Sequence, residues 1–351
     1  MIRVLLVGAG AMGQAWLEAV RDDPGVQLAG VVDLDLAAAR RAAPGLPVGT
    51  DVTALAATTG ADAVIDVTVP AAHHAVTTAA LFAGLPVLGE KPVADTLARA
   101  LSLVAAADVS GQLFMVSQSR RWNPQLFTLR AMTEALGPAH AVSTDFHRAP
   151  RFGGFREQMA QPLLVDMAIH AFDAARFLLD ADPVAVTCQT WNPPWSWYAG
   201  DACAAAVFEM TTGARYVYHG SWCSPGAETS WNGEWRVSAE HGTARWDGDH
   251  DPAGPPVDAS EGRYSGIGGA LRVFAEALDS GVTPMGEVHG NVLSLAMVEA
   301  AVDSAAARGR PVLIDDVLAR AHEQAVREES RADVREVLRG WTDVQAALQP
   351  A

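Results

Sequence analysis

The stretch IRVLLVGAGAMG, residues 2–13, decides the fold, because an apolar strand runs directly into a glycine turn. A helical pattern follows the turn, and a second apolar segment, residues 26–32, ends at Asp33. Strand, glycine turn, helix, strand and acid, with the acid about 20 residues past the last glycine, is the order of a dinucleotide-binding unit. This order predicts nucleotide binding, whereas a glycine triplet alone would also suit an ordinary loop.

Each glycine of the turn has its own expected task. Gly8 makes the tight turn, Gly10 lets the backbone approach a pyrophosphate, and Gly13 lets the helix pack against its strand. The first N–H groups of the helix, around Ala11 and Met12, then face the phosphates with the positive end of the helix dipole behind them. These five residues form the predicted phosphate-binding part of the site.

Asp33 favours NAD, because its carboxylate can accept a hydrogen bond from the ribose hydroxyl and repels a 2′-phosphate. Arg40 and Arg41 lie further on, in the region expected to form the next helix, and could soften this preference. NAD is therefore the predicted cofactor, with NADP as the alternative.

Length and charge limit the class of protein. A chain of 351 residues exceeds what one core usually serves, so two domains are expected. The net charge of −16, from 25 basic and 41 acidic residues, repels nucleic acids and anionic membranes. No apolar run reaches the length of a membrane span, and no charged leader precedes the first strand. We therefore expect a cytoplasmic protein with neither a nucleic-acid nor a membrane partner.

The cysteines do not indicate a metal site. Cys188, Cys203 and Cys223 are odd in number, and their spacing fits neither a zinc site nor a disulfide framework. We interpret them as buried thiols and predict no metal.

Residues 1–122 alternate short apolar segments with alanine-rich helical stretches. Beyond the elements above, the patterns predict strands at residues 62–67, 85–88 and 113–117 and helices at residues 71–82 and 96–107. Strands that alternate with helices form a parallel sheet covered on both faces. The first domain is therefore predicted to be a Rossmann fold, a doubly wound parallel sheet of the α/β class.

Residues 123–351 have a different rhythm and are predicted to form a second domain. The expected elements are a helix at 124–136, strands at 139–147, 184–190, 202–210, 214–221 and 231–238, and helices at 163–179, 267–278 and 291–307. A run of strands after a helix indicates an antiparallel sheet and an α+β domain. Residues 247–265 should form a long surface loop. Residues 316–351 should form a tail of one or two helices.

Two residues that can carry chemistry follow the strand predicted at residues 85–88. In an open parallel sheet, ligands bind beyond the carboxyl ends of the strands, so Glu90 and Lys91 should point toward the cofactor cleft. A lysine there can donate hydrogen bonds to a hydroxyl or carbonyl oxygen. The alternative is a surface lysine in a turn.

Asp166 and His170 are four residues apart in a helical stretch, which places both on one face. A carboxylate beside an imidazole can orient it for proton transfer. The alternatives are a surface pair or a histidine satisfied within the core. Asp173 continues the same face and is expected to be structural.

Two further segments follow strands of the first domain. The backbone at Thr68 and Pro70 should line the nicotinamide side of the cleft, with His73 just beyond. Arg120 and Trp122, after the strand predicted at 113–117, could hold a polar substrate, with salt bridges at the domain boundary as the alternative.

Seven of the ten tryptophans lie between Trp191 and Trp246. Indole faces suit the C–H faces of a sugar ring, so one or two could shape a substrate pocket. Packing on a sheet face is the expected role of most of them.

Taken together, these motifs resemble the Gfo/Idh/MocA oxidoreductases, which include inositol dehydrogenases, glucose-fructose oxidoreductase and many sugar dehydrogenases. The glycine turn with Asp33, the Thr68 segment, Glu90-Lys91-Pro92, the segment from Arg120 to Pro124, and Asp166 with His170 occur in that family's order. The resemblance runs from residue 1 to about residue 315, and the tail beyond departs from the family pattern.

The resemblance implies a Rossmann domain joined to a domain whose large, mostly antiparallel sheet has one open face. Relatives commonly use that face to form dimers or tetramers, so a homodimer or homotetramer is expected. By motif, Lys91 corresponds to the family's active-site lysine, and Asp166 and His170 correspond to its Asp-x-x-x-His pair. The implied activity is an NAD(P)-dependent dehydrogenase that acts on a secondary alcohol of a sugar, cyclitol or related polyol.

Physical chemistry agrees with this assignment. When hydride leaves a secondary alcohol, its hydroxyl proton must leave too, so a positioned base and a stabilising cation are needed. We expect His170 to accept the proton, oriented by Asp166, with Lys91 bonded to the reacting oxygen. The sequence leaves open which of Lys91 and His170 takes the proton.

Three other functions compete with this one, and one of them is a reductase that acts on an imine or carbonyl. A regulatory protein on the same fold could sense NAD without turnover, although it would need no proton-transfer groups. An NAD-dependent glycoside hydrolase would oxidise its substrate only transiently and release no net NADH.

Overall fold

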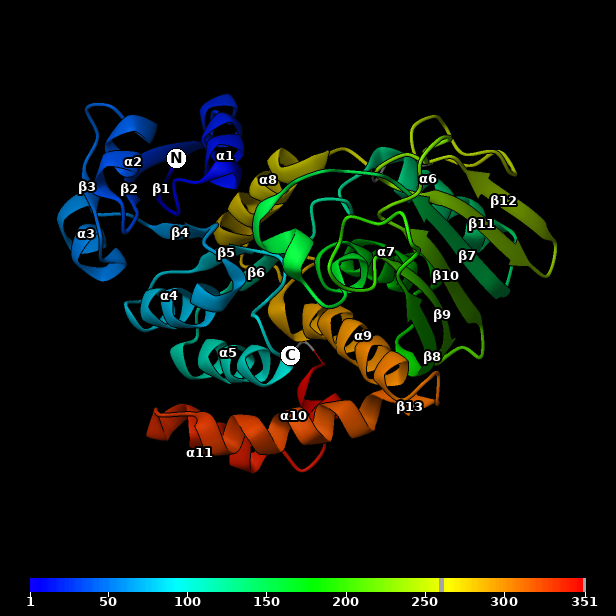
Figure 1. The fold of residues 1–351 in the computed structure, drawn as a ribbon. Helices are drawn as coiled ribbons and strands as arrows, with labels where there is room; N and C mark the ends of the chain where they lie inside the picture. The colour runs from blue at the N-terminus through cyan, green and yellow to red at the C-terminus, as the bar shows by residue number, and fades with distance from the viewer. Residues whose placement is uncertain (259–261, 350–351) are drawn as a thin grey trace. The chain divides into compact units, whose positions relative to one another are not determined.

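The computed structural model describes residues 1–258 and 262–349, and the chain divides into two units (Figure 1). The first unit comprises Met1–Ser119, Tyr264–Val292 and Leu318–Ala351. The second comprises Arg120–Arg263 and Leu293–Val317. This division differs from the single boundary expected at residues 122/123, because two later segments return to the first unit. One reason is that their apolar faces are buried there: helix α8 (Gly266–Ser280) packs against the first helix and the last strand of that unit.

The first unit is built on a six-stranded parallel sheet in the order β3-β2-β1-β4-β5-β6, as expected for a Rossmann fold. Its strands are β1 (Ile2–Val7), β2 (Val26–Val32), β3 (Val48–Gly49), β4 (Ala63–Asp66), β5 (Val87–Glu90) and β6 (Phe114–Ser117). The central strands β4 and β5 are buried along their whole length, and β1 is buried at every residue except Arg3, because helices cover both faces. The two-residue edge strand β3 carries too few residues to show a pattern, and the sequence did not predict it.

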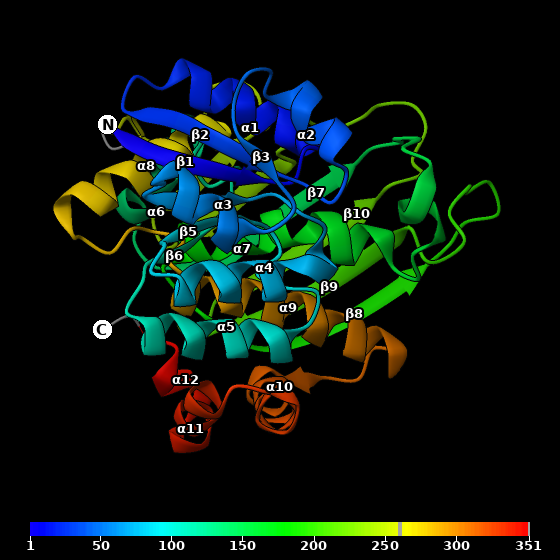
Figure 2. The ribbon, with the colours of Figure 1, turned by 90° about the vertical axis from the view of Figure 1, so that its left-hand side faces the viewer.

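The helices of this unit begin and end at recognisable signals. They are α1 (Ala11–Asp22), α2 (Leu36–Ala42), α3 (Val52–Thr59), α4 (Pro70–Phe82) and α5 (Leu97–Ser110). Asp35 and Asp51 cap the N-termini of α2 and α3 with their carboxylates, and Thr96 caps α5. Figure 2 shows α4 and α5 side by side, with α11 beside α5.

The tail forms three helices rather than the expected one or two: α10 (Ile314–Glu328), α11 (Ala332–Gly340) and α12 (Val344–Ala347). Helix α11 packs on α5 through Val334 and Leu338, both fully buried. The buried carboxylate of Glu329 accepts hydrogen bonds from the Ser102 hydroxyl of α5 and from the N–H of Arg331. The tail therefore completes the first unit.

The second unit contains a seven-stranded sheet in the order β12-β11-β7-β10-β9-β8-β13. Its strands are β7 (Ala139–His147), β8 (Pro183–Trp191), β9 (Cys203–Met210), β10 (Arg215–Ser221), β11 (Glu234–Ala239), β12 (Gly242–Trp246) and β13 (Val312–Leu313). Only β7 and β10 pair in parallel, so the prediction of a mostly antiparallel sheet is confirmed.

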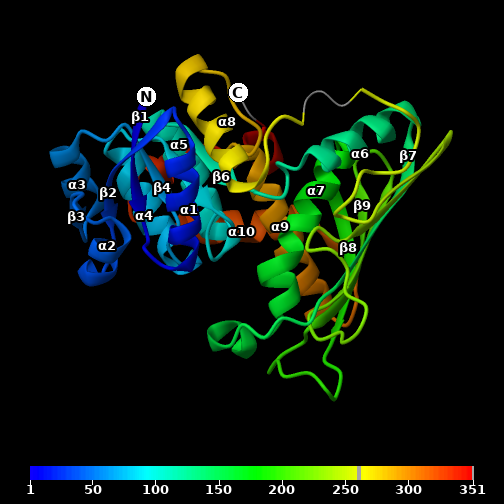
Figure 3. The ribbon, with the colours of Figure 1, turned by 90° about the horizontal axis from the view of Figure 1, so that it is seen from above.

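Helices cover one face of this sheet. Figure 3 shows α6 (Pro124–Ala135) and α7 (Ile169–Leu179) against that face, and no helix of the described residues covers the other. The strands alternate accordingly: in β7, Val142, Thr144 and Phe146 are buried while Asp145 is exposed. Helix α9 (Val288–Ala306) runs from the first unit into the second.

The helix expected at residues 163–179 is divided in two. Its first part, Leu163–Ala168, is a π-helical turn, and α7 begins at Ile169. A 3₁₀ turn, Gly154–Gln158, precedes it in the arginine-containing loop after β7. Turns of the π type occur often at functional sites, which directs attention to Asp166 and His170.

Two expectations from composition can be compared with the structure. Cys188, Cys203 and Cys223 are buried free thiols, as predicted, and burial raises the pKa of Cys188 to about 12. Among the described helices, none combines the length and the apolar character that a membrane crossing requires.

Candidate active site

The glycine turn, Asp33, Thr68 and Lys91 all lie at one edge of the six-stranded sheet. Val7 pairs with Val32 and Asp66, and Asp66 pairs with Gly89, so the residues after these strands emerge together at the carboxyl edge. The strand order reverses between β1 and β4, which is where open α/β sheets bind their ligands.

The glycine turn fits a pyrophosphate. Gly8 has φ +107°, and a Cβ there would lie 2.8 Å from the carbonyl oxygen of Val67, so only glycine suits this turn. A Cβ on Gly13 would lie 2.2 Å from the carbonyl oxygen of Gly8. At Gly10 a Cβ would meet no atom within 4 Å, which leaves open space in front of the α1 N-terminus. Since the first turn of α1 carries no acidic residue, nothing there opposes an anion.

Asp33 is held in place by the backbone around it. Its Oδ2 accepts a hydrogen bond of 2.7 Å from the N–H of Ala9, and its Oδ1 accepts one of 2.8 Å from the N–H of Asp35. The carboxylate thus ties the end of β2 to the glycine turn and retains lone pairs for a ribose hydroxyl. Arg40 and Arg41 lie in the last turn of α2, and Arg41 is 3.8 Å from Asp35.

His73 supports the cleft backbone rather than opening into it. Its ring is 2% exposed, with Nδ1 2.8 Å from the carbonyl oxygen of Pro92 and Nε2 3.0 Å from that of Thr68. Both ring nitrogens are therefore occupied, and the imidazole links the Thr68–Pro70 segment to the segment after Lys91. Buried Asp66 fixes the same segment by accepting hydrogen bonds from the N–H and the hydroxyl of Thr68.

Glu90 and Lys91 differ in their surroundings. Glu90 is buried and accepts a hydrogen bond of 2.9 Å from the indole N–H of Trp16, and burial raises the pKa of its carboxyl group. Lys91 is half-buried and follows it at the end of β5. The 25 basic residues of the chain include one lysine, Lys91, and all the others are arginines.

In the second unit, Asp166 and His170 lie at the junction of the π turn and α7. Asp166 Oδ2 accepts a hydrogen bond of 2.6 Å from Nε of Arg156, which comes from the 3₁₀ turn of the loop. The sequence did not predict this partner, because a contact between a loop and a helix leaves no periodic signal.

His170 lines a cavity between α7 and the covered face of the seven-stranded sheet. The lining is largely aromatic and includes Arg120, His170, Tyr218, Trp231, Trp235 and Trp246. The proposal that some tryptophans shape a pocket therefore has a structural counterpart here. Tyr218 was not predicted, although its alternation with Tyr216 on β10 was a signal that could have pointed to the covered face.

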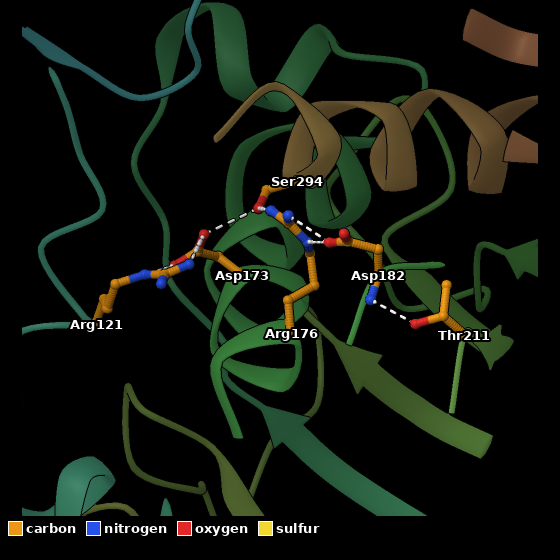
Figure 4. A network of polar contacts seen from close by, with 6 residues as sticks. All are labelled: Arg121, Asp173, Arg176, Asp182, Thr211 and Ser294. Carbon is orange, nitrogen blue, oxygen red and sulfur yellow. Dashed lines mark hydrogen bonds and ion pairs between the residues drawn. The ribbon is translucent and has the colours of Figure 1, made fainter. Parts of the chain in front are cut away.

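Arg121 and Asp173 form a structural network beside this cavity, shown in Figure 4. Nε and Nη2 of Arg121 donate to Asp173 at 2.9 and 2.7 Å, and the Ser294 hydroxyl donates to the same carboxylate at 2.9 Å. Arg176 donates to Ser294 and, through two nitrogens, to Asp182.

Trp122 has a packing position. It is 4% exposed and stacks on Phe127 of α6 with a centroid distance of 6.4 Å. It is not among the described residues that line the cavity, so of the two residues suggested for substrate binding after β6, Arg120 is the one that reaches it.

One group of residues could hold a metal ion. The ligand atoms of Asp145, His147 and His219 lie within 4.8 Å of one another. They alternate with Phe146 and Tyr218, so they lie on the face opposite the cavity. An ion there would take no part in chemistry at His170.

Family comparisons agree with the architecture. A model of the GFO/IDH/MocA family, described as an oxidoreductase family with an NAD-binding Rossmann fold, matches residues 2–118. A model of the GFO/IDH/MocA C-terminal domain matches residues 129–245.

Individual relatives extend along most of the chain. An uncharacterized protein, y4oX, from Sinorhizobium fredii is 30% identical over 90% of this chain and 96% of its own length. A D-apiose dehydrogenase from Paraburkholderia graminis is 27% identical over 90% of each chain. The crystal structure of GenD2 from gentamicin A biosynthesis, in complex with NAD, is 25% identical with a TM-score of 0.75, over 89% of this chain and 96% of that one.

Proposed function

The chain belongs to the Gfo/Idh/MocA oxidoreductase family, and from this premise we propose that it oxidises a secondary alcohol of a sugar, cyclitol or related polyol with NAD. The observation that carries the proposal is the lone lysine at the carboxyl edge of the Rossmann sheet. Arginine serves at every other basic position, and its planar guanidinium differs from the compact ammonium of lysine, which carries its charge and its three donors at one point. A group that must donate to a single reacting oxygen explains a lysine at residue 91.

The first unit fits the cofactor. The open space at Gly10 suits a pyrophosphate, and Asp33 is placed to accept a hydrogen bond from a ribose hydroxyl. When bound there, NAD supplies a nicotinamide ring that accepts a hydride. His73 and Asp66 keep the backbone at Thr68 and Pro70 in position.

The proton of the alcohol is handled by Lys91, Asp166 and His170 in this proposal. His170 accepts it as general base, and Lys91 donates a hydrogen bond to the reacting oxygen, where negative charge develops. Asp166 orients the imidazole, and the ion pair with Arg156 fixes Asp166 in turn. The aromatic lining offers apolar faces to the C–H groups of the ring.

Substitution of Lys91 tests the proposal. We expect Lys91→Ala and Lys91→Arg to lower kcat by at least about 100-fold, while NAD affinity changes by less than about threefold. The arginine variant is the matched control for charge, because it keeps the cation and replaces the compact ammonium donor by a planar guanidinium. Rates would be followed as NADH absorbance with a panel of sugars and cyclitols.

Two outcomes would contradict the proposal. Wild-type-like rates in the alanine variant would remove Lys91 from the mechanism. Turnover of a glycoside without net NADH would instead favour the hydrolytic use of NAD, and NAD binding without turnover of any compound would favour a sensor.

A further inference from the structure

Arg120 is a buried cation without a protein partner. Its side chain lines the cavity, and its Nη1 is fully enclosed without a hydrogen-bond partner. Across residues 1–258 and 262–349, no ion pair or hydrogen bond to its guanidinium occurs; its Cζ lies over the face of Trp231, 5.8 Å from the ring centroid. Burial lowers the pKa of Arg120 to about 10, which shows how unfavourable the charge is in this place.

Other buried arginines of the same unit are treated differently. Arg121 has the carboxylate of Asp173, and Arg176 has that of Asp182 (Figure 4). Because an uncompensated buried charge costs several kcal/mol, structural arginines are normally paired in this way. Arg120 departs from that pattern in an aromatic cavity that has His170 in its lining.

Tyr218 offers a second unused donor in the same cavity. Its hydroxyl is buried, the residue being 1% exposed, and it has no hydrogen-bond partner among the described residues. Burial raises the pKa of Tyr218 well above its usual value, so the group stays a donor. A Cβ at residue 220 would lie 2.8 Å from this hydroxyl, so the glycine there leaves the hydroxyl uncrowded.

The electrostatic surroundings favour an anion. Arg148 lies with its guanidinium 4.5 Å from the ring of Trp231, the same indole that Arg120 contacts. Arg148 pairs with Glu228 and donates to the carbonyl oxygen of Thr229, so its charge is compensated. Of the two arginines on this indole, Arg120 is therefore the one for which no carboxylate partner occurs among the described residues.

We propose that the substrate carries a carboxylate, and that Arg120 with Tyr218 binds this carboxylate in the cavity beside His170. The inference rests on the proposed dehydrogenase function and narrows its substrate class to sugar acids, such as aldonates and uronates. A guanidinium fork matches the two oxygens of a carboxylate, and a phenol O–H adds a third donor. A neutral polyol would leave the buried cation uncompensated.

Matched substrates test the inference. Initial rates with NAD would be compared for uronates against the corresponding aldoses and for aldonates against the corresponding alditols, with sugar phosphates as a separate series. We expect kcat/KM to be at least about 100-fold higher for the acids than for their neutral partners, because the neutral compounds leave the buried donors unpaired. A preference for sugar phosphates over the acids would overturn the carboxylate assignment.

Variants identify the responsible residue. Arg120→Gln should lower kcat/KM for the acid by about 100-fold, mainly through KM, and change the neutral partner by less than about threefold. Arg120→Lys should restore part of the preference, and Tyr218→Phe should weaken it by a smaller factor. Arg151→Gln is the control, because that arginine is exposed and contacts only the ring of Trp197 among the described residues.

The outcomes separate this inference from the proposed function. If neutral compounds are oxidised as well as acids and Arg120→Gln affects both alike, the inference fails and the dehydrogenase proposal stands. If no compound is oxidised, the melting temperature of the protein with NAD is measured with and without each sugar acid. The change in melting temperature then shows whether the acids bind. Stabilisation that Arg120→Gln abolishes supports the anion site without the proposed reaction, and no stabilisation overturns both.

Discussion

At the scale of single residues, Asp33 has one observed role and one proposed role. It holds the glycine turn through the N–H of Ala9, and we propose that it also contacts the ribose. Loss of the side chain therefore removes a cofactor contact and loosens the turn at the same time. A variant that keeps an acceptor oxygen separates the two effects.

We predict that Asp33→Asn weakens NAD binding by about 10-fold to 100-fold, the value of one charge-assisted hydrogen bond, and weakens NADP binding much less. The asparagine oxygen can still accept from Ala9, its NH2 group loses the bond that Oδ1 accepts from the N–H of Asp35, and the repulsion of a 2′-phosphate disappears. Asp33→Ala should weaken the binding of both cofactors further, and NAD should again lose more affinity than NADP. Fluorescence titration with each nucleotide measures this, and equal losses for NAD and NADP would show that the acid does not contact the ribose.

The sequence could identify the position of Lys91, but for Arg120 it left open whether the side chain binds substrate or forms a salt bridge. Lys91 follows a strand in a motif, which fixes its place at the sheet edge. Whether Arg120 is paired depends on which carboxylates surround it after folding. Its neighbour Arg121 pairs with Asp173, 52 residues away, whereas no carboxylate among the described residues pairs with Arg120.

At the scale of elements, helix α7 is held by the network of Arg121, Asp173 and Ser294. We predict that Asp173→Ala lowers the free energy of unfolding by about 3–5 kcal/mol, because it leaves the buried Arg121 cation uncompensated. The double variant Arg121→Met/Asp173→Leu should recover most of this loss, since it removes both charges. Urea denaturation measures both, and a single-variant loss below about 1 kcal/mol would contradict the structural role.

A second element-scale contact predicts a pH dependence. His289, near the start of α9, lies 2.8 Å from Glu287 and 3.0 Å from Asp108 of α5. Burial lowers the pKa of His289, but the hydrogen bonds and charges of the two carboxylates outweigh it and raise the pKa to about 9. Because the folded pKa lies above the unfolded one, the stabilisation is complete below pH 6.5 and is lost as the pH rises toward 9.

We predict that the free energy of unfolding falls by about 1–2 kcal/mol between pH 6.5 and pH 9, a value reduced from that of a fully buried pair by solvent screening. His289→Gln should flatten this part of the profile. His140→Gln, at an exposed position of β7, is the control and should leave the slope unchanged. Parallel profiles for the wild type and His289→Gln would contradict the assignment.

At the scale of the whole molecule, the uncovered face of the seven-stranded sheet is the expected surface for self-association. Val207 of β9 and Trp191 of β8 are each 41% exposed there. Large apolar side chains on an open sheet face are typical of oligomer interfaces.

We predict that the protein sediments as a dimer or tetramer at micromolar concentration and that Val207→Lys shifts it to the monomer. Val282→Lys, in the loop after α8, is the control because it adds the same charge at an exposed apolar position of the other unit. Sedimentation velocity distinguishes the species. A monomeric wild type, or a Val207→Lys variant that stays assembled, would show that this face is not the interface.

The sequence by itself determined the Rossmann unit. Residues 2–7 and 26–32 form strands with the predicted bounds, and Gly8 has the positive φ that its turn requires. Local sequence suffices to predict this part of the fold, because consecutive residues carry the apolar strand pattern, the turn glycines and the signals that start the helix. The strand at residues 139–147 was found for the same reason, whereas short β3 and the π turn before α7 left too little pattern to read.

Only the tertiary structure decided what the remaining residues do. It returned residues 264–292 and the tail to the first unit, paired Asp166 with Arg156, and left Arg120 and Tyr218 as enclosed donors in an aromatic cavity. These facts depend on contacts between segments far apart in the chain, and pairing and desolvation arise only when such segments meet. The motifs could therefore indicate a dehydrogenase. The preference for an anionic substrate that we propose depends on side chains that only the fold brings together in the cavity.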